Sequence, residues 1–204
     1  MRIATAAVVA LAGLVGAFAP TDHVSADGWP CGVAGAQLLR ESRTAVVAKR
    51  AYQSGRVEAR YYGCLRSTGR PVVVTEYLRY EEGDVREVWD DSIRINGRFV
   101  LVVTTWCLGE CGLPRIGVHD LRSGQRVKAF DARGLPEPLF LTSRGAVVYA
   151  DADADDTLLY VADAAGHRRV ASGSEQDLPL KSVRIRGNRL QWRFRGSEQS
   201  LQLR

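Results

Sequence analysis

The sequence lacks the short motifs on which most hydrolytic and nucleotide-dependent active sites are built. It has no G-x-S-x-G, H-E-x-x-H or glycine-rich phosphate-binding motif. It has only three histidines, and His23 falls in the predicted leader, which leaves His119 and His167. His119 precedes Asp120, but adjacent strand residues point to opposite faces. The sequence therefore gives little support for an enzyme.

Two kinds of long apolar pattern are also missing. No long stretch repeats apolar residues every 3.6 positions, as an amphipathic helix would. Residues 3–19 carry no charge, but they are rich in alanine and glycine and too few for a transmembrane helix, which needs about 20 strongly apolar residues. These absences argue against a helical domain and against a membrane-spanning one.

The N-terminal segment instead has the features of a signal peptide. Arg2 precedes the uncharged stretch, and two small-residue sites follow, at 17–19 and 24–26. Pro20 makes the first site a poor substrate, so we expect cleavage after Ala26. The sequence thus predicts a signal peptide at 1–26, one domain at 27–204, a secreted or extracytoplasmic location and no stable membrane insertion after cleavage. The alternative is an uncleaved N-terminal membrane anchor.

Four cysteines follow the leader, and an even number in an exported chain indicates disulfide bonds. Cys107 and Cys111 bound a short loop that a local bridge would close, which leaves Cys31 to pair with Cys64. The alternative is a zinc site formed by Cys107, Cys111 and the nearby His119, and it would require reduced thiols.

The sequence is rich in repeated strand-turn-strand segments. Residues 94–103, 140–149 and 183–192 share this layout, with turns at Gly97, Gly145 and Gly187, and Ser42 marks an earlier copy. A second turn motif recurs at Gly69, Gly124 and Gly166, 55 and 42 residues apart. Such periods predict an all-β fold, a propeller-like array of about four small antiparallel sheets. A β-sandwich is the alternative, since its hairpins have similar sequences.

The repeats also predict how the strands pair. Every connection is too short for a parallel crossover, so all neighbours should be antiparallel. The expected pairs are 98–106 with 116–121, 146–150 with 158–162, and 190–195 with 200–203. Asn96-Gly97 predicts a type I′ turn. The last repeat is one strand short, and residues 33–39 are expected to supply that strand. Residues 80–91, with six acidic side chains and one arginine, are expected to form a connector.

Segments 96–102 and 119–127, together with their copies, resemble secreted bacterial β-propeller-like repeat proteins, most of them uncharacterised. The resemblance covers about residues 38–204. It implies ligand binding or scaffolding more often than catalysis, and it carries over no catalytic residue.

Alternating carboxylates suggest one possible metal site. Asp151, Asp153 and Asp155 occupy the first, third and fifth positions of a calcium-loop pattern, but the glycine and the final glutamate of that pattern are missing. The alternative is a solvated hairpin loop. Apart from calcium, the sequence indicates no cofactor.

Positive charge is carried almost entirely by arginine, because only three lysines are present. On the last predicted hairpin, Arg184 and Arg186 share one face, and Arg193 and Arg195 share a face of the partner strand. They could bind anionic envelope components, although a merely soluble charged face is the alternative. Another envelope protein is a second candidate partner, whereas nucleic acid is not expected to bind an exported chain.

Two functional classes follow from these observations. The first is a secreted binding or scaffold domain of the cell envelope or extracellular space that uses loops at one end of the sheets. The second is a hydrolase of an envelope glycan or glycoconjugate, with acidic residues at a channel mouth. Glu58, Glu76, Glu82 and Asp120 are candidates for that role.

Overall fold

The computed structural model describes residue 28 and residues 30–53, 55–80, 84–108, 110–134, 136–137, 139–153 and 156–204. Within these ranges the chain forms strands and three short 3₁₀ turns but no α-helix, which confirms the all-β prediction. None of the helical segments in these ranges has the length and apolarity needed to cross a membrane. The predicted signal peptide and the cleavage before Asp27 lie outside the described residues.

The strands follow one another closely along the chain. They are β1 (Gln37–Glu41), β2 (Ala45–Ala51), β3 (Val57–Leu65), β4 (Val72–Arg79), β5 (Val85–Val88), β6 (Arg94–Asn96), β7 (Phe99–Leu108), β8 (Glu110–Cys111), β9 (Arg115–Asp120), β10 (Gln125–Asp131), β11 (Leu139–Leu141), β12 (Val147–Asp153), β13 (Asp156–Asp163), β14 (Gly166–Gly173), β15 (Arg184–Arg186), β16 (Arg189–Phe194) and β17 (Ser197–Gln202). The 3₁₀ turns are η1 (Pro30–Gly32), η2 (Asp90–Ser92) and η3 (Leu180–Ser182).

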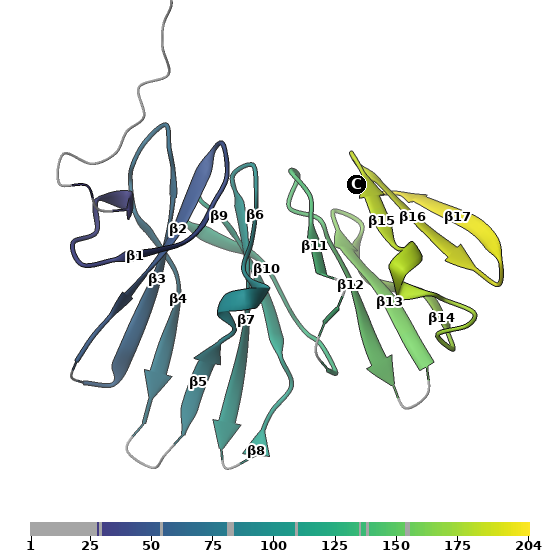
Figure 1. Ribbon diagram of the computed structural model, residues 1–204, viewed down its shortest axis with the longest axis horizontal. Helices are drawn as coiled ribbons and strands as arrows, with labels where there is room; N and C mark the ends of the chain where they lie inside the picture. Colours follow the sequence, from purple (N-terminus) through teal and green to yellow (C-terminus); the bar gives the residue numbers. More distant parts are fainter. Residues whose placement is uncertain are drawn as a thin grey trace, which may run out of the picture.

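Most strands belong to four units that stand side by side along the long axis of the molecule (Figure 1). Unit 1 is β1-β2-β3-β4, unit 2 is β6-β7-β9-β10, unit 3 is β11-β12-β13-β14 and unit 4 is β15-β16-β17. Every pairing is antiparallel, and β7 pairs with β9, β12 with β13 and β16 with β17. The predicted strand pairs are therefore confirmed.

The predicted acidic connector contains a strand, and this changes the number of sheets. β5 pairs with β4 on one side and with β7 on the other. Units 1 and 2 are thereby joined into one ten-stranded sheet, and units 3 and 4 form sheets of four and three strands. The fold thus has three sheets rather than the four that were expected.

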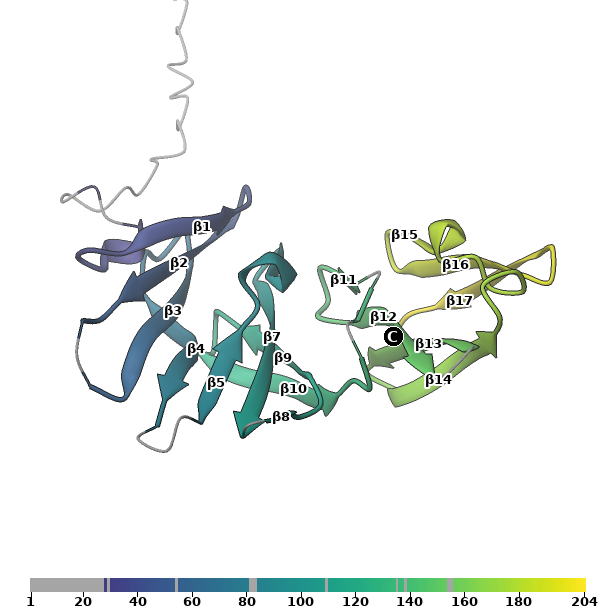
Figure 2. The same cartoon turned by 60° about the horizontal axis from the view of Figure 1, so that its bottom comes forward.

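The units pack face to face, and the core lies in layers between them (Figure 2). Strand β7 contributes to two layers, because its side chains alternate between two apolar surroundings. Val100 and Val102 pack against unit 1, whereas Leu101 and Val103 pack against unit 3. A third layer joins unit 3 to unit 4, with Leu190 and Trp192 among its members. Stacking of this kind fits a propeller-like array and a layered sandwich equally well.

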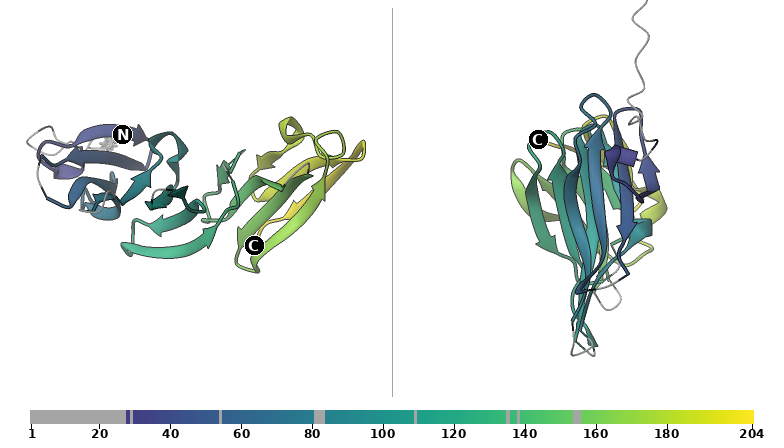
Figure 3. Two further views of the ribbon diagram at one scale, coloured as in Figure 1. Left: turned by 90° about the horizontal axis from the view of Figure 1, so that it is seen from below. Right: turned by 90° about the vertical axis from the view of Figure 1, so that its left-hand side faces the viewer.

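The array is open within the described residues, and the expected closing strand is located elsewhere. β1, which overlaps the proposed 33–39 segment, pairs with β2 and not with unit 4. The physical reason is local. The Cys31–Cys64 bridge holds the segment before β1 against unit 1, so it cannot reach the other end of the molecule. Figure 3 shows units 1 and 4 at opposite ends.

The glycine turns recur as expected, but their geometry differs from a type I′ turn. Asn96 pairs with Phe99, so Gly97 and Arg98 are the two central residues. Only Gly97 has a positive φ, 61°, which is the pattern of a type II′ turn. Gly187 is placed in the same way, with φ 58°. Gly145, φ 76°, instead lies in a loop of five residues, 142–146, between the paired residues Leu141 and Val147.

Both predicted disulfides are present. Cys31 joins Cys64, with Cα atoms 5.6 Å apart, and Cys107 joins Cys111, with Cα atoms 3.9 Å apart. The first bridge packs with Val46 and Val33 on the outer face of unit 1. The second links directly opposed residues of β7 and β8. With both thiols of the second pair oxidised, the zinc alternative is wrong.

Candidate functional site

Hairpin turns from successive units contact one another at one end of the array, the upper end in Figure 1. The Thr44 hydroxyl of unit 1 donates to the Gly97 carbonyl of unit 2 at 2.8 Å. The Asn96 side-chain amide of unit 2 donates to the Leu141 carbonyl of unit 3 at 2.9 Å. These bonds fix the spacing between turns that are far apart in sequence.

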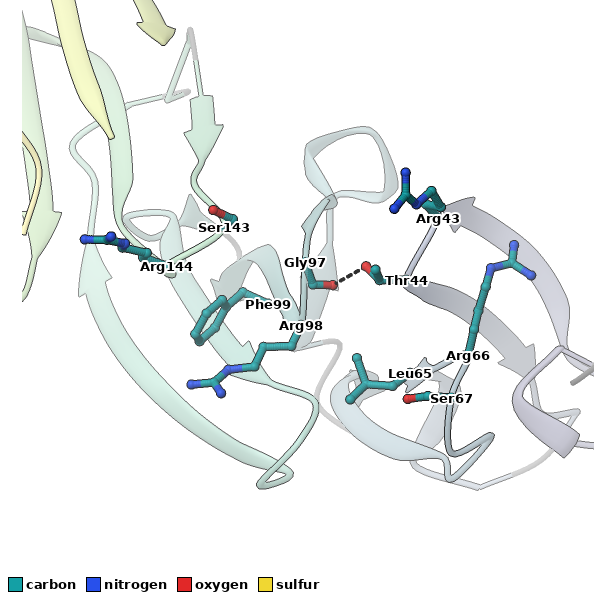
Figure 4. A pocket seen from close by; sticks show the side chains of 10 residues that line it. All are labelled: Arg43, Thr44, Leu65, Arg66, Ser67, Gly97, Arg98, Phe99, Ser143 and Arg144. Carbon is teal, nitrogen blue, oxygen red and sulfur yellow. Dashed lines mark hydrogen bonds between the residues drawn. The ribbon is translucent and has the colours of Figure 1, made fainter. Parts of the chain in front are cut away.

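A pocket of about 640 Å³ opens between these turns (Figure 4). We call it the turn pocket. Its lining comes from the β1–β2, β6–β7 and β11–β12 turns and from the turn after β3: Arg43, Thr44, Leu65, Arg66, Ser67, Gly97, Arg98, Phe99, Ser143 and Arg144. Four of these residues are arginines, three carry hydroxyls and none is acidic. The lining therefore offers hydrogen-bond donors and positive charge.

Two of the four arginines are held by acidic neighbours outside the lining. Arg66 forms an ion pair with Glu41, and its Nε donates to the Ser42 carbonyl at 3.0 Å. Arg98 Nε lies 3.2 Å from an Asp120 carboxylate oxygen, and its guanidinium lies over Phe99, 5.0 Å from the ring centre. These contacts orient the two side chains and partly neutralise them.

The other two arginines have no acidic partner among the described residues. Arg144 Nε and Nη1 lie 2.9 and 2.8 Å from the neutral Asn188 amide, which accepts both bonds when its oxygen faces the guanidinium. Arg43 is exposed and is placed at the opposite side of the turn pocket (Figure 4). The pocket thus carries uncompensated positive charge on both sides.

Sequence reasoning missed this site, although a signal for it was present. We call the turns that directly precede β2, β7, β12 and β16 the inner turns. Each of them contains or directly precedes an arginine: Arg43, Arg98, Arg144 and Arg189. The periodic arginine marks one end of the array only once the order of the units is known.

Two further pockets lie beside the inner strands β6 and β11. One, of about 660 Å³, is lined by residues of both charge signs, including Arg94, Glu137 and Lys181, and by apolar side chains. The other, of about 220 Å³, shares Arg94 and Glu137 and adds Asp91. Asp91 also forms an exposed ion pair with Arg40 at 3.3 Å. Neither pocket has a surplus of one sign comparable to that of the turn pocket.

The structure groups three of the four arginines that were proposed as an anion site. Arg184, Arg186 and Arg193 are exposed on one face of unit 4, and the register adds Arg189 opposite Arg186. Arg184 forms an exposed ion pair with Glu198 at 3.3 Å. Arg195 lies in the β16–β17 turn with φ 47° and contacts Asp177 at 3.7 Å, so it is apart from the others.

The proposed calcium residues lie in a longer hairpin than expected. Asp151 and Asp153 belong to β12, and the Asp151 side chain is buried and accepts the Arg133 backbone N–H. The Asp153 side chain and Asp155 lie outside what the structure describes. Within the described residues, no three His, Cys, Asp or Glu side chains are grouped to hold a metal ion.

The carboxylates considered for glycoside hydrolysis are engaged by arginines. Glu58 lies 2.8 Å from Arg79, and Glu76 lies 2.6 Å from Arg60. Asp120 is the partner of Arg98, and Glu82 is outside the described residues. The structure does not bring these acids together in any of the pockets above.

The chain matches no protein-family model and no curated protein sequence.

Proposed function

We propose that this protein is an extracytoplasmic binding domain, built on a propeller-like array, that recognises an anionic ligand in the turn pocket. The lining carries the proposal: it contains four arginines and three hydroxyl side chains and no carboxylate. An acidic glycan or a phosphate-bearing polymer of the cell envelope has the matching chemistry.

Arginine suits such a ligand better than a diffuse positive surface would. Its planar guanidinium donates two parallel hydrogen bonds to a carboxylate or phosphate. Arg43 and Arg144 lie on either side of the pocket without an acidic partner among the described residues, so they are available to two anionic groups of one polymer. Because the pocket is open to solvent, each contact is weak alone and is screened by salt. Several such contacts together are therefore needed to bind the ligand.

The turn pocket also has the rigidity that recognition requires. Loops carry binding residues most effectively when a packed scaffold positions them. Here the turns are anchored to one another by the Thr44–Gly97 and Asn96–Leu141 hydrogen bonds. The two disulfides support the proposed location, since such bonds persist in oxidising compartments.

The alternative function, hydrolysis of an envelope glycan, rests on Asp91 and Glu137, which line the smaller inner pocket together. If it were correct, Glu137→Gln would abolish release of reducing ends from an acidic glycan while leaving its binding intact. If the wild-type protein does not cleave the glycan, the hydrolase alternative is refuted.

The binding proposal is tested with two matched double variants. Arg43→Gln/Arg144→Gln removes two charges from the turn pocket, and Arg184→Gln/Arg186→Gln removes two from the face of unit 4. Binding to polygalacturonate, dextran sulfate and polyphosphate is measured by calorimetry, with neutral dextran as the negative control. We expect the pocket variant to lose about tenfold or more in affinity, since two charge-assisted contacts are removed.

The unit 4 variant should retain the wild-type affinity, and the wild-type affinity should fall as salt rises. The reverse ranking of the two variants would place the anion site on unit 4. No binding of any polyanion by the wild-type protein would refute the proposal.

A further inference from the structure

Units 2 and 3 meet at their outer edge through a stack of four rings. Phe130 of β10 lies over His167 of β14, with ring centres 4.6 Å apart, and Tyr149 and Tyr160 stack at 5.1 Å. The Tyr149 hydroxyl and His167 Nε2 are 2.9 Å apart and share a hydrogen bond. Together the rings fill the space between the two units.

The strand register identifies the equivalent positions between units 1 and 2. Asp120 and Asp163 both end a strand, and each accepts the backbone N–H two residues later at 2.9 Å, so β9 aligns with β13 there. Three positions before these aspartates, Gly117 of β9 corresponds to Tyr160 of β13. Their partners on the preceding strands, Val102 and Tyr149, then correspond as well. On the following strands, Arg126 corresponds to His167.

The fourth ring is matched in the same way. Phe130 pairs with Ile116, four positions before the end of β9, and Thr75 pairs with Tyr61, four positions before the end of β3. Thr75 is therefore the counterpart of Phe130. Between units 1 and 2 every ring of the stack is replaced, two by small or branched apolar residues, one by a threonine and one by an arginine.

Arg86 of β5 enters the place where the rings are missing. Its Nη2 lies 3.4 Å from the Thr75 hydroxyl, while its buried Nε has no hydrogen-bond partner within the described residues. Burial, and then the neighbouring Arg126 and Arg115, lower the pKa of Arg86, while Glu76 and Tyr80 only partly oppose this shift. The Arg86 guanidinium thus lies near other positive charges, and a nearby negative charge would stabilise it.

His119 adds a second buried donor position beside it. The side chain is 9 % exposed and lies opposite Arg126, and its Nδ1 has no partner in the part of the chain that the structure describes. Burial, Arg126 and Arg86 lower the pKa of His119 to about 4. At neutral pH the ring is therefore uncharged, and one of its nitrogens can donate.

Two described carboxylates near these arginines are already engaged. Glu76 pairs with Arg60 at 2.6 Å, and Asp131 pairs with Arg115 at 3.6 Å. Arg86 and Arg126 form no ion pair with any described residue. Buried polar groups of a folded protein normally have partners. Within the described residues Arg86 Nε has none, and neither has His119 Nδ1, which donates in one of the two neutral tautomers, so together they indicate a missing acceptor.

We propose that Arg86, His119 and Arg126 form a second site, separate from the turn pocket, that binds a small oxyanion such as phosphate, sulfate or a carboxylate group. One oxyanion supplies the acceptors that Arg86 Nε and His119 Nδ1 lack. It also supplies the negative charge that Arg86 and Arg126 lack.

Binding at this site is linked to protonation of His119. An adjacent anion favours the imidazolium form and raises the histidine pKa. Between the pKa of the free protein and that of the complex, binding then takes up a proton, so affinity rises as pH falls. The charged groups that lower the pKa of His119 are Arg126 from β10 and Arg86 from β5, and they oppose protonation until the anion is present.

The test is histidine-specific NMR titration of the full chain in phosphate, in sulfate, in acetate and in chloride at equal ionic strength. The His119 signal is assigned with His119→Gln. We expect the oxyanions to raise the His119 pKa by about one unit or more relative to chloride. His167 should titrate identically in all four salts. An unchanged His119 pKa, or an equal shift of both histidines, would overturn the proposal.

Arg126→Gln and Arg169→Gln serve as the matched pair, because both arginines are exposed on outer strands and only the first lies opposite His119. Arg126→Gln should lose most of the oxyanion-induced shift, and Arg169→Gln should keep it. Arg43→Gln/Arg144→Gln should also keep it, which separates this site from the turn pocket. An equal shift in the Arg126 variant would contradict the assignment.

Discussion

Gly97 shows at the scale of one residue how the turns of this fold are specified. Its φ of 61° lies in a region that β-branched residues avoid. A Cβ atom there would meet no atom closer than 3.6 Å, so conformation rather than space requires glycine. The same residue supplies the carbonyl that Thr44 binds. Its conformation therefore affects both the hairpin and the turn pocket.

Replacing Gly97 with valine should destabilise the protein by about 1–3 kcal/mol, because the strained φ is retained or the turn rearranges. Urea unfolding measures the change. Ser143→Val, at an exposed position of the next inner turn without a positive φ, is the control and should stay within about 0.5 kcal/mol of wild type. Equal effects of the two changes would contradict the turn argument.

Asp163 illustrates a buried charge that is fully satisfied. Burial alone would raise its pKa, but bonds from Arg168, from the Arg204 backbone N–H and from the Ala165 backbone N–H together lower it to about 2. A carboxylate whose pKa falls on folding stabilises the protein above its unfolded pKa of 3.8. That stabilisation is lost as pH falls toward 2.

Between pH 6 and pH 2 this group should contribute a loss of about 2 kcal/mol in the free energy of unfolding. Asp163→Asn should lower stability at pH 6 and flatten the acid limb of the stability curve. The exposed Asp131, 3.6 Å from Arg115, provides the comparison, and Asp131→Asn should change little. Acid unfolding of the three proteins decides the matter, and parallel curves would refute the role of Asp163.

At the scale of single elements, the sequence predicted most strands. The prediction missed β5, because charged residues interrupt the apolar pattern there. Val85 and Val88 of β5 stand among acidic residues, and the strand is held by long-range pairing with β4 and β7 rather than by its own composition. Likewise, Asn96-Gly97 predicted a type I′ turn, but the pairing of Asn96 with Phe99 moved the turn by one residue. Register depends on the apolar pattern of both paired strands as well as on the turn, so the Asn-Gly pair alone does not determine it.

The two disulfides tie elements together over very different chain lengths. Cys31 and Cys64 are separated by 33 positions, and Cys107 and Cys111 by 4. On the chain-entropy estimate, removing the first bridge should cost about 3–4 kcal/mol and removing the second about 2 kcal/mol. Urea unfolding of the Cys31→Ser/Cys64→Ser and Cys107→Ser/Cys111→Ser proteins tests the ranking. A larger loss from the second pair would contradict it.

At the scale of the whole molecule, the repeats predicted an array of antiparallel hairpins. The turn pocket and the Arg86–His119–Arg126 site could not be predicted. Each combines side chains from strands or turns in different units, and their meeting depends on how the units stack. The prediction that residues 33–39 supply the closing strand was wrong for a related reason. The Cys31–Cys64 bridge holds that segment at unit 1.

Layered packing should give the molecule an uneven resistance to local opening. Strands β7 and β12 have buried residues on both faces, whereas every residue of the outer strands β10 and β14 is exposed or half-buried. Backbone amides of β7 and β12 should therefore exchange with solvent most slowly, at rates close to those set by global unfolding. Hydrogen exchange followed by NMR measures this order. Slowest exchange in β10 or β14 would show that the layers do not form the stable core.

The unlike outer faces of units 1 and 4 have a consequence for assembly. Stacked sheets can in principle add further copies at each end and grow into filaments. At one end, Cys31 and Val33 already cover Val46 and Cys64. At the other, a second copy would have to desolvate the guanidiniums of Arg184, Arg186, Arg189 and Arg193 against a face of unit 1 on which the carboxylates of Glu58 and Glu76 are already paired with Arg79 and Arg60. Head-to-tail polymerisation is thus opposed at both ends by the same side chains that terminate the fold.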